Sequence, residues 1–448
     1  MTTLLEMAQY LKEGRITATE LVERALAAAA RSEHVFISLL EHRARSAAQA
    51  SDQRWRDGTP LSPLDGIPYG VKDLVDVAGS RTTAGSPSRA GIPLAQEDAQ
   101  VIATLSRMGM IPLGKTNLSE FAYSGLGLNP YFGTPVADFP ALEARAPGGS
   151  SSGSAIAVQR GVVSVALGTD TAGSIRVPAA FNGLVGFKAT TGRYAMQGVH
   201  PLAATLDSLG PLAHSVADCV AFDAAMLGRS ELTLPATPPT QLRLVVDSSV
   251  MADAQLQPAV RDNLLAAMER LRAAGVEVEQ RPLLSVARTR ALIADVGWLG
   301  AIEAWRLLGA IVEGPDGPAM DPRVRKRLRA ARQLSTDSEA RIRRVRLELM
   351  GAMAQELNGA LLVLPTVLHV APALAALERD DELFAAVNLN TLSLTMIGSL
   401  LDMPGVAIPS GTDPQGLPTS LLFSLPRGGD EWLLSACLTF QALLSPPR

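Results

Sequence analysis

The chain has 448 residues, of which 47% are hydrophobic and 19% are charged, and this balance is typical of a globular protein with a large core. A formal net charge of −4 and an aromatic content of 4% argue against a basic or aromatic-rich surface for nucleic acid. The two cysteines, Cys219 and Cys437, form no CxxC pair and no Cys/His cluster, so we expect neither a disulfide framework nor a structural zinc site.

The N-terminal segment, MTTLLEMAQYLKEG, carries charged residues and lacks the apolar core of a signal peptide. The longest apolar stretch, residues 359–377, is interrupted by Pro365, His369 and Pro372. It therefore fits buried strand-and-turn structure better than a membrane span. We expect a cytoplasmic protein that does not cross a membrane.

The first half of the chain alternates predicted helices with predicted strands. Two helices are expected within the first thirty residues, and Thr17-x-x-Glu20 is a capping box that opens the second. A further helix is predicted at residues 99–108. Buried strands are predicted where short apolar runs are bounded by glycine or proline, at residues 67–71, 110–113, 161–167 and 185–187. This alternation predicts an α/β fold with a parallel or mixed sheet.

The second half begins after a loop rich in proline and threonine at residues 229–241. The predicted elements that follow are a strand at 242–246, a helix at 258–274 and a strand at 276–279. Residues from about 285 to 357 are predicted to be mostly helical, with a loop at 313–322. Residues 361–424 are predicted to return to apolar strands joined by turns.

Two segments of small residues could line a site. The run Gly148–Ser154 is either a flexible linker or part of a site, and the apolar residues 155–158 that follow favour a place between buried elements. The segment 168–176 follows a predicted strand. Backbone N–H groups of such a turn can hold an oxyanion, although an ordinary tight turn is the alternative.

Lys72 ends an apolar run, so we expect it at a strand end and partly buried. A buried lysine has a lowered pKa and can act as a neutral base. The alternative is a solvated lysine, or one paired with a neighbour such as Asp73.

Gly149-x-Ser151-x-Gly153 also matches the nucleophile elbow of α/β-hydrolases, which would need a histidine such as His200, His214 or His369. No clear strand leads into Gly149, so the context fits that motif poorly. Neither glycine-rich segment is followed by Gly-Lys-Ser/Thr, which excludes a P-loop. The basic residues between 323 and 346 are most simply a solvated helix face, with contact to an RNA backbone as the minor alternative.

Taken together, these segments resemble the amidase signature family. The matching residues, in chain order, are Leu64–Pro68 with Gly70–Asp73, Gly114–Asn117 with Glu120–Ala122, Gly148–Ala155, Gly168–Arg176 with Pro178–Ala180, Leu184–Lys188 and Asp207–Pro211. Looser matches follow at residues 364–366 and 416–418. The similarity is good over residues 1–225 and loose over 360–445.

The resemblance implies one amidase signature domain over residues 1–448, with a central mixed β-sheet, helices on both faces and a variable helical region at about 285–357. It also implies a Ser–cis-Ser–Lys triad, in which Ser174 is the nucleophile, Ser150 the bridging serine and Lys72 the base. The implied oxyanion hole consists of backbone N–H groups, those of Thr171, Ala172, Gly173 and Ser174.

Such a triad hydrolyses a linear carboxamide or urea-type C–N bond through an acyl-enzyme and releases ammonia or an amine, with no metal or organic cofactor. Ser152 and Ala172 stand where many members have glycine, and the usual Asn-Pro-Trp is missing after Gly133-Thr134-Pro135. For Arg176 and Ser151, a substrate-binding and a structural role both remain open, the latter for Arg176 through Asp170.

The same resemblance leaves two other functions open: the A subunit of a tRNA-dependent amidotransferase, and a catalytically silent scaffold. The implied ligand is a small amide or urea-derived molecule, and nucleic acid is not expected. A homodimer and a small partner subunit remain open.

Overall fold

The computed structural model describes residues 2–139 and 143–444. Eleven strands of this part form one sheet, with the bounds β1 Phe36–Leu39, β2 Pro68–Lys72, β3 Ile111–Thr116, β4 Val165–Asp170, β5 Val185–Lys188, β6 Ser208–Ala213, β7 Arg243–Asp247, β8 Glu277–Arg281, β9 Leu361–Pro365, β10 Gly405–Thr412 and β11 Pro418–Ser424. Their order is β1-β3-β2-β4-β6-β5-β10-β11-β9-β7-β8. The sheet is mixed: β2 runs parallel to β3 and β4, β7 runs parallel to β8 and β9, and the other neighbours are antiparallel.

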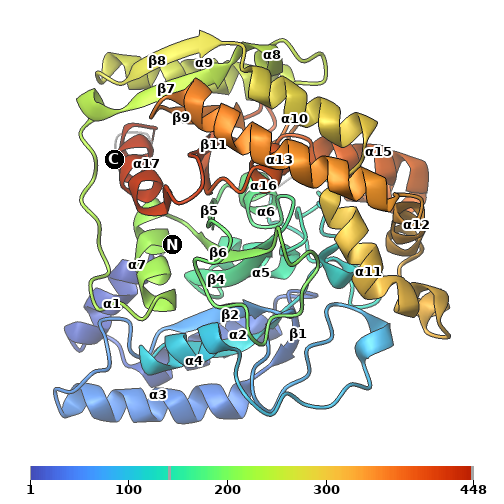
Figure 1. Cartoon of the computed structure of the whole chain (residues 1–448). Helices are drawn as coiled ribbons and strands as arrows, with labels where there is room; N and C mark the ends of the chain where they lie inside the picture. The colour runs from blue at the N-terminus through green and yellow to red at the C-terminus, as the bar shows by residue number, and fades with distance from the viewer. Residues whose placement is uncertain (1, 140–142, 445–448) are drawn as a thin grey trace.

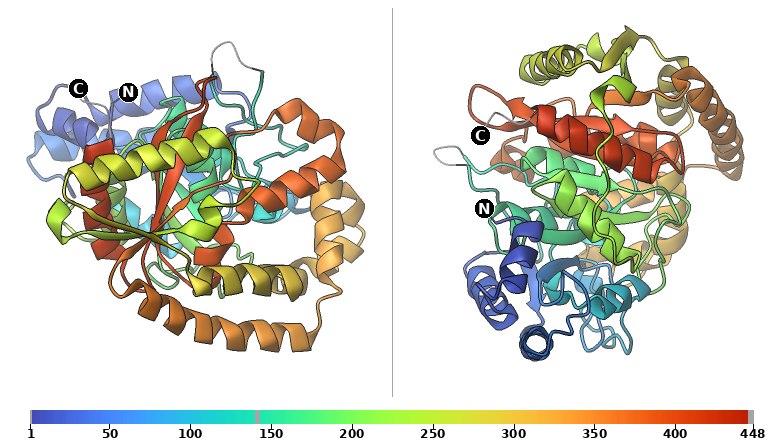
Figure 2. Two further views of the ribbon diagram at one scale, coloured as in Figure 1. Left: turned by 90° about the horizontal axis from the view of Figure 1, so that it is seen from above. Right: turned by 90° about the vertical axis from the view of Figure 1, so that its left-hand side faces the viewer.

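Helices cover both faces of this sheet (Figure 1). Their bounds are α1 Leu4–Lys12, α2 Ala18–Ala30, α3 Glu41–Arg56, α4 Gln100–Arg107, α5 Ser152–Gln159, α6 Arg176–Phe181, α7 Val216–Met226, α8 Ser248–Met251, α9 Pro258–Ala273, α10 Leu284–Asp295, α11 Leu299–Glu313, α12 Pro322–Ala331, α13 Thr336–Leu357, α14 Leu374–Arg379, α15 Asp381–Leu392, α16 Thr395–Leu400 and α17 Asp430–Leu444. α7, α9 and α17 pack on one face, which the right-hand view of Figure 2 shows from outside, and α5 and α6 pack on the other. The predicted α/β fold with a mixed sheet is confirmed.

The predicted capping box is present at the start of α2. Thr17 Oγ1 accepts a hydrogen bond from Glu20 N at 3.1 Å, and the Glu20 carboxylate accepts one from Thr17 N at 2.9 Å. Within residues 2–139 and 143–444, no helix is both long and apolar enough to cross a membrane.

Two predicted segments differ from the structure. The strand predicted at 161–167 begins later, at Val165, because α5 runs to Gln159 and Gly161, with φ of 67°, ends the helix in a left-handed turn. The prediction of strands throughout 361–424 was wrong, because α14, α15 and α16 lie between β9 and β10. In α15 the buried residues follow helical spacing, at Phe384, Asn388, Thr391 and Leu392.

The sheet brings two parts of the sequence together where the site lies. β2 and β4 are parallel neighbours, with Gly70 opposite Ala166 and Val71 opposite Leu167. All residues of both strands are buried. The carboxyl ends of parallel neighbours meet at one edge of the sheet, so Lys72 at the end of β2 lies beside the end of β4.

Candidate active site

Lys72 is completely buried at the end of β2. Its Nζ lies 2.7 Å from Ser150 Oγ and 2.7 Å from Thr169 Oγ1. Burial lowers the pKa of Lys72 to about 7, although the negative charges of Asp170 and Asp207 act in the opposite direction. Near neutral pH a large part of the protein therefore carries a neutral amine, whose lone pair is available to the Ser150 hydroxyl.

Asp73, the neighbour that could have paired with Lys72, has another partner. Its Oδ1 lies 2.7 Å from Lys115 Nζ, and both side chains are fully buried. The Asp73 carboxylate also accepts hydrogen bonds from the backbone N–H and the hydroxyl of Thr83. The ion-paired alternative for Lys72 is thus not the arrangement in the structure.

Ser150 belongs to a tightly packed loop and not to a flexible linker. Its peptide bond to Gly149 is cis, and its carbonyl accepts a hydrogen bond from Ser119 N at 3.1 Å. A Cβ at Gly149 would lie 2.6 Å from Gly127 N, so the loop requires glycine there. The serines that follow open α5 and are also buried.

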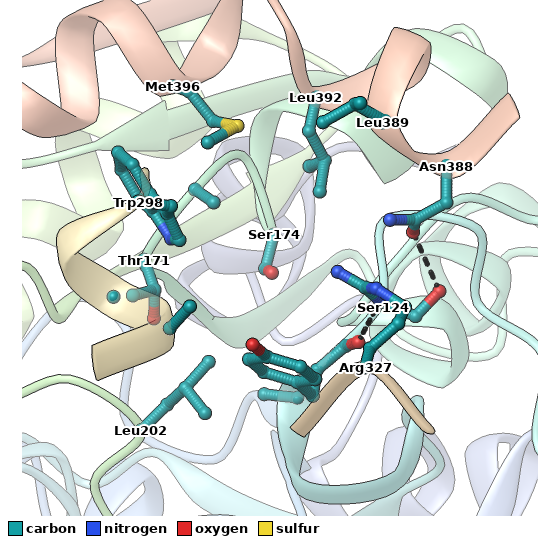
Figure 3. Close-up of a pocket in the computed structure, with 15 residues that line it drawn as sticks. Ser124, Thr171, Ser174, Leu202, Trp298, Arg327, Asn388, Leu389, Leu392 and Met396 are labelled. Carbon is teal, nitrogen blue, oxygen red and sulfur yellow. Dashed lines mark hydrogen bonds between the residues drawn. The ribbon is translucent and has the colours of Figure 1, made fainter. Parts of the chain in front are cut away.

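Ser174 lies in the turn from β4 to α6 and lines a cavity (Figure 3). Its carbonyl accepts a hydrogen bond from Ser151 N at 3.2 Å, which ties the two small-residue segments together. A Cβ at Gly173, whose φ is 142°, would lie 2.3 Å from Thr395 Oγ1. Thr395 Oγ1 also donates to the Ala172 carbonyl at 2.6 Å. Sequence reasoning missed this contact, because α16 is more than two hundred residues away along the chain.

The position of Thr171 is fixed by a hydrogen bond of its side chain. Its Oγ1 donates to Asp207 at 2.5 Å, and the same carboxylate accepts from the backbone N–H groups of Leu202, at 2.8 Å, and Ala203, at 3.0 Å. Burial raises the pKa of Asp207 to about 6. The Asp207–Pro211 motif is thereby connected to the turn that contains Ser174.

Arg176 makes a buried ion pair. Its Nη2 lies 2.8 Å from Asp170 Oδ1 and its Nε 3.0 Å from Oδ2, and neither side chain is exposed. Its other donors reach the Thr395 carbonyl, at 2.9 Å, and Ser399 Oγ, at 2.7 Å. The guanidinium therefore joins β4 to α16.

Ser151 is fully buried, as expected for a residue with a structural role. Its Oγ lies 3.3 Å from the Thr169 carbonyl. Two of the histidines that an α/β-hydrolase would need have other partners: His214 Nε2 contacts the Val158 carbonyl, and His369 Nε2 contacts Thr391 Oγ1. Residues 146–150 are not part of a strand, so the nucleophile-elbow interpretation is wrong.

The cavity in front of Ser174 has a volume of about 130 Å³. Figure 3 shows Trp298 and Met396 on one side of Ser174 and Arg327 and Asn388 on the other. The apolar walls favour a small ligand, and the few polar groups would orient it.

Arg327 brings a positive charge to this cavity. Its Nη1 donates to the Tyr123 carbonyl at 2.5 Å, and its guanidinium lies 4.8 Å from the centre of the Tyr123 ring. Burial lowers its pKa, partly offset by Tyr123 and Asp321. Among the ion pairs of the described residues none includes Arg327.

The prediction of a solvated basic face at 323–346 is wrong for Arg327. The residue lies three positions after Val324 and four before Ala331, both buried, so it shares the inner face of α12. Helical periodicity could have identified it. Within the part of the chain that the structure describes, no three His, Cys, Asp or Glu side chains gather as a metal site.

Comparison with known proteins shows the family to which the chain belongs. The family model Amidase matches residues 19–434. A 2-amino-5-chloromuconic acid deaminase of Comamonas testosteroni is 34% identical over 453 aligned residues, which cover 99% of this chain and 96% of that protein. The A subunit of a glutamyl-tRNA(Gln) amidotransferase from Cupriavidus metallidurans is 40% identical over 230 residues, 51% of this chain and 45% of the relative.

A crystal structure of an amidase superposes with a TM-score of 0.87 at 31% identity and covers 99% of this chain and 100% of that one. The match of the family model extends over most of the chain, and the full-length likenesses in sequence and structure agree with it. The chain therefore belongs to the amidase signature family and is an enzyme that hydrolyses amides.

Proposed function

We propose that the chain hydrolyses a linear carboxamide or urea-type C–N bond through Ser174, with Ser150 and Lys72 as its proton relay. The observation that carries this proposal is the 2.7 Å contact between the buried Lys72 Nζ and Ser150 Oγ, beside a cavity that Ser174 lines. A histidine is not needed, because a lysine with a pKa of about 7 is itself a base at neutral pH.

In the proposed reaction, Ser150 gives its proton to neutral Lys72 and takes the proton of Ser174. The Ser174 oxygen attacks the carbonyl carbon, and a tetrahedral intermediate forms. When the C–N bond breaks, the proton returns from Lys72 through Ser150 to the leaving ammonia or amine. Water then gives a proton to the relay and its oxygen attacks the acyl carbon. The bond from that carbon to the Ser174 oxygen breaks, the relay returns the proton to Ser174, and the acid is released.

The proposed oxyanion hole consists of the backbone N–H groups of Thr171, Ala172, Gly173 and Ser174. Thr395 supports this assignment, because its hydroxyl holds the Ala172 carbonyl. In a trans peptide the carbonyl and the following N–H point in opposite directions, so the Gly173 N–H is directed away from Thr395. Loss of one such donor costs roughly a hundredfold or more in rate.

We propose further that the substrate is a small molecule with a carboxylate. Arg327 is a cation beside the cavity with no acidic partner among the described residues, and a carboxylate is the natural partner of a guanidinium. The relative from Comamonas testosteroni acts on an acid, by its name. Arg176, already paired with Asp170, we assign to structure, and Ser151 likewise.

The amidotransferase A subunit remains the second candidate, since the relative of that name matches half of this chain. Glutamine also carries a carboxylate, so Arg327 is compatible with both. We propose that the whole chain acts as one domain in the cytoplasm, either alone, as a homodimer, or with a small partner subunit.

The experiment is ammonia release by the purified protein and its Ser174→Ala variant. The panel contains glutamine, malonamate, allophanate, biuret-type carboxylates, indoleacetamide, and neutral aliphatic and aryl amides. We expect release from one carboxylated group of compounds by the unaltered protein only. Release from glutamine alone, stimulated by tRNA or a partner chain, would support the amidotransferase instead. Equal release by Ser174→Ala would contradict the proposed nucleophile.

A further inference from the structure

The turn that contains Glu120 has an unusual backbone. Phe121 and Ala122 have φ of 50° and 58°, in the left-handed region that residues with a side chain rarely adopt. The turn is fixed by Phe121 N donating to the Ala84 carbonyl, at 2.8 Å, and Tyr123 N donating to the Glu120 carbonyl, at 3.0 Å. A conformation of this kind persists only where its surroundings enforce it, and such turns concentrate at functional sites.

The turn holds α12 at two points. The Glu120 carboxylate accepts a hydrogen bond from Asp321 N, at 2.7 Å, and Asp321 is the residue that caps α12. Six residues further along, Arg327 donates to the Tyr123 carbonyl and lies over the Tyr123 ring. The same four-residue turn therefore fixes both the start of α12 and the guanidinium that faces the cavity.

The Glu120 carboxylate is buried, and both of its oxygens accept hydrogen bonds. The residue is 1% exposed, and its second oxygen accepts from Ser86 Oγ at 2.6 Å. The charged group that acts on it is Asp321, whose carboxylate pairs with Arg323 at 2.8 Å. Burying a carboxylate that has two hydrogen-bond donors and no paired cation destabilises the folded protein. The purpose of its two directional hydrogen bonds therefore needs an explanation.

Given the proposed role of Arg327, which this inference requires, we propose that Glu120 is a positioning residue: its hydrogen bond to the start of α12 keeps Arg327 at the distance from Ser174 that a carboxylated substrate needs. The reach of the side chain, and not its charge, is what matters. Glutamine at this position has the same length and retains an oxygen that accepts from Asp321 N. Aspartate retains the charge but is one methylene shorter.

The test is protection of Ser174 from a fluorophosphonate probe by malonate, a small dicarboxylate. The malonate concentration that halves the labelling rate is measured in the unaltered protein, Arg327→Gln, Glu120→Ala, Glu120→Asp and Glu120→Gln. Each concentration is determined relative to the labelling rate of the same variant without malonate. A variant that is simply labelled more slowly therefore gives the same value. Thermal unfolding checks that each variant is folded.

We expect this concentration to rise about tenfold or more in Arg327→Gln, Glu120→Ala and Glu120→Asp, which corresponds to the loss of one charge-assisted contact. In Glu120→Gln it should stay within about threefold of the unaltered protein. Should Glu120→Ala fail to fold, the Asp and Gln variants still decide the question. Strong protection in Glu120→Asp combined with weak protection in Glu120→Gln would overturn the positioning role, as would unchanged protection in all Glu120 variants.

The failures of the two proposals are distinguishable. If malonate protects Arg327→Gln as well as the unaltered protein, the assignment of Arg327 to the substrate carboxylate is wrong. If Ser174 is not labelled in any protein, the proposed nucleophile is wrong. If Arg327→Gln loses protection and the Glu120 variants do not, only the inference about Glu120 is wrong.

Discussion

Lys72 and Lys115 are both fully buried, and replacing each by methionine should change stability in opposite directions. Lys72 has a pKa of about 7 in the folded protein against 10.5 for an ordinary lysine. At pH 7 folding therefore removes the proton from about half of the molecules, and the lowered pKa destabilises the folded state by about 4 kcal/mol. Lys72→Met avoids this cost but loses contacts to two hydroxyls, each worth about 1 kcal/mol, and leaves a net gain of about 2 kcal/mol.

The sign of the pH dependence follows from the lowered pKa. Between pH 7 and 10.5 the unfolded chain binds the proton that the folded protein has lost, so the stability of the unaltered protein rises with pH. The advantage of Lys72→Met should therefore shrink by about 1.4 kcal/mol per pH unit over this range. Below pH 7 it should be constant.

The assay is urea unfolding at several pH values between 6.5 and 9.5, with Lys115→Met as the matched control. That substitution leaves the buried Asp73 carboxylate without its cation, at 2.7 Å in the unaltered protein, and should cost about 3–5 kcal/mol. A Lys72→Met protein that is less stable at pH 7, or whose stability difference does not change with pH, would refute the assignment of Lys72 as a neutral, desolvated base.

Three further outcomes are expected. The value of kcat/KM should fall about tenfold per pH unit below pH 7, because Lys72 must be neutral to accept a proton; a flat profile from pH 5 to 8 would contradict this. Thr395→Val removes the hydroxyl that holds the Ala172 carbonyl and should lower kcat about tenfold with little change in KM, as steady-state kinetics would reveal; a rise in KM alone would not fit. Arg176→Met leaves Asp170 buried and unpaired, and chemical unfolding should show a loss of about 3–5 kcal/mol; a loss below about 1 kcal/mol would mean that the pair is not structural.

Much of the sheet could be predicted from the sequence, because apolar runs that end in glycine or proline have few alternatives when they are short. The same assumption, that an apolar run is a strand, led to a wrong prediction for segment 366–404. Its helices are apolar on several faces, so composition suggested strands, and only the spacing of Phe384, Asn388 and Leu392 indicates a helix.

At the candidate site, the sequence indicated the residues that lie within continuous motifs. Thr169 was overlooked although it is part of such a motif, because its role depends on the pairing of β2 with β4, which sets it against Lys72. Thr395 and Arg327 come from helices far away in the chain, and only the fold brings Thr395 to Ala172 and Arg327 to the cavity. Arg327 was further hidden among other arginines that do face solvent.

The most direct test of the central claim is to map the fluorophosphonate adduct by mass spectrometry in the unaltered protein and in Lys72→Met. The proposed relay predicts one adduct, on Ser174, in the unaltered protein, and a labelling rate reduced at least a hundredfold in Lys72→Met, because the base that activates the serine is lost. An adduct on Ser150 or Ser151, or labelling of Ser174 at an undiminished rate without Lys72, would contradict it.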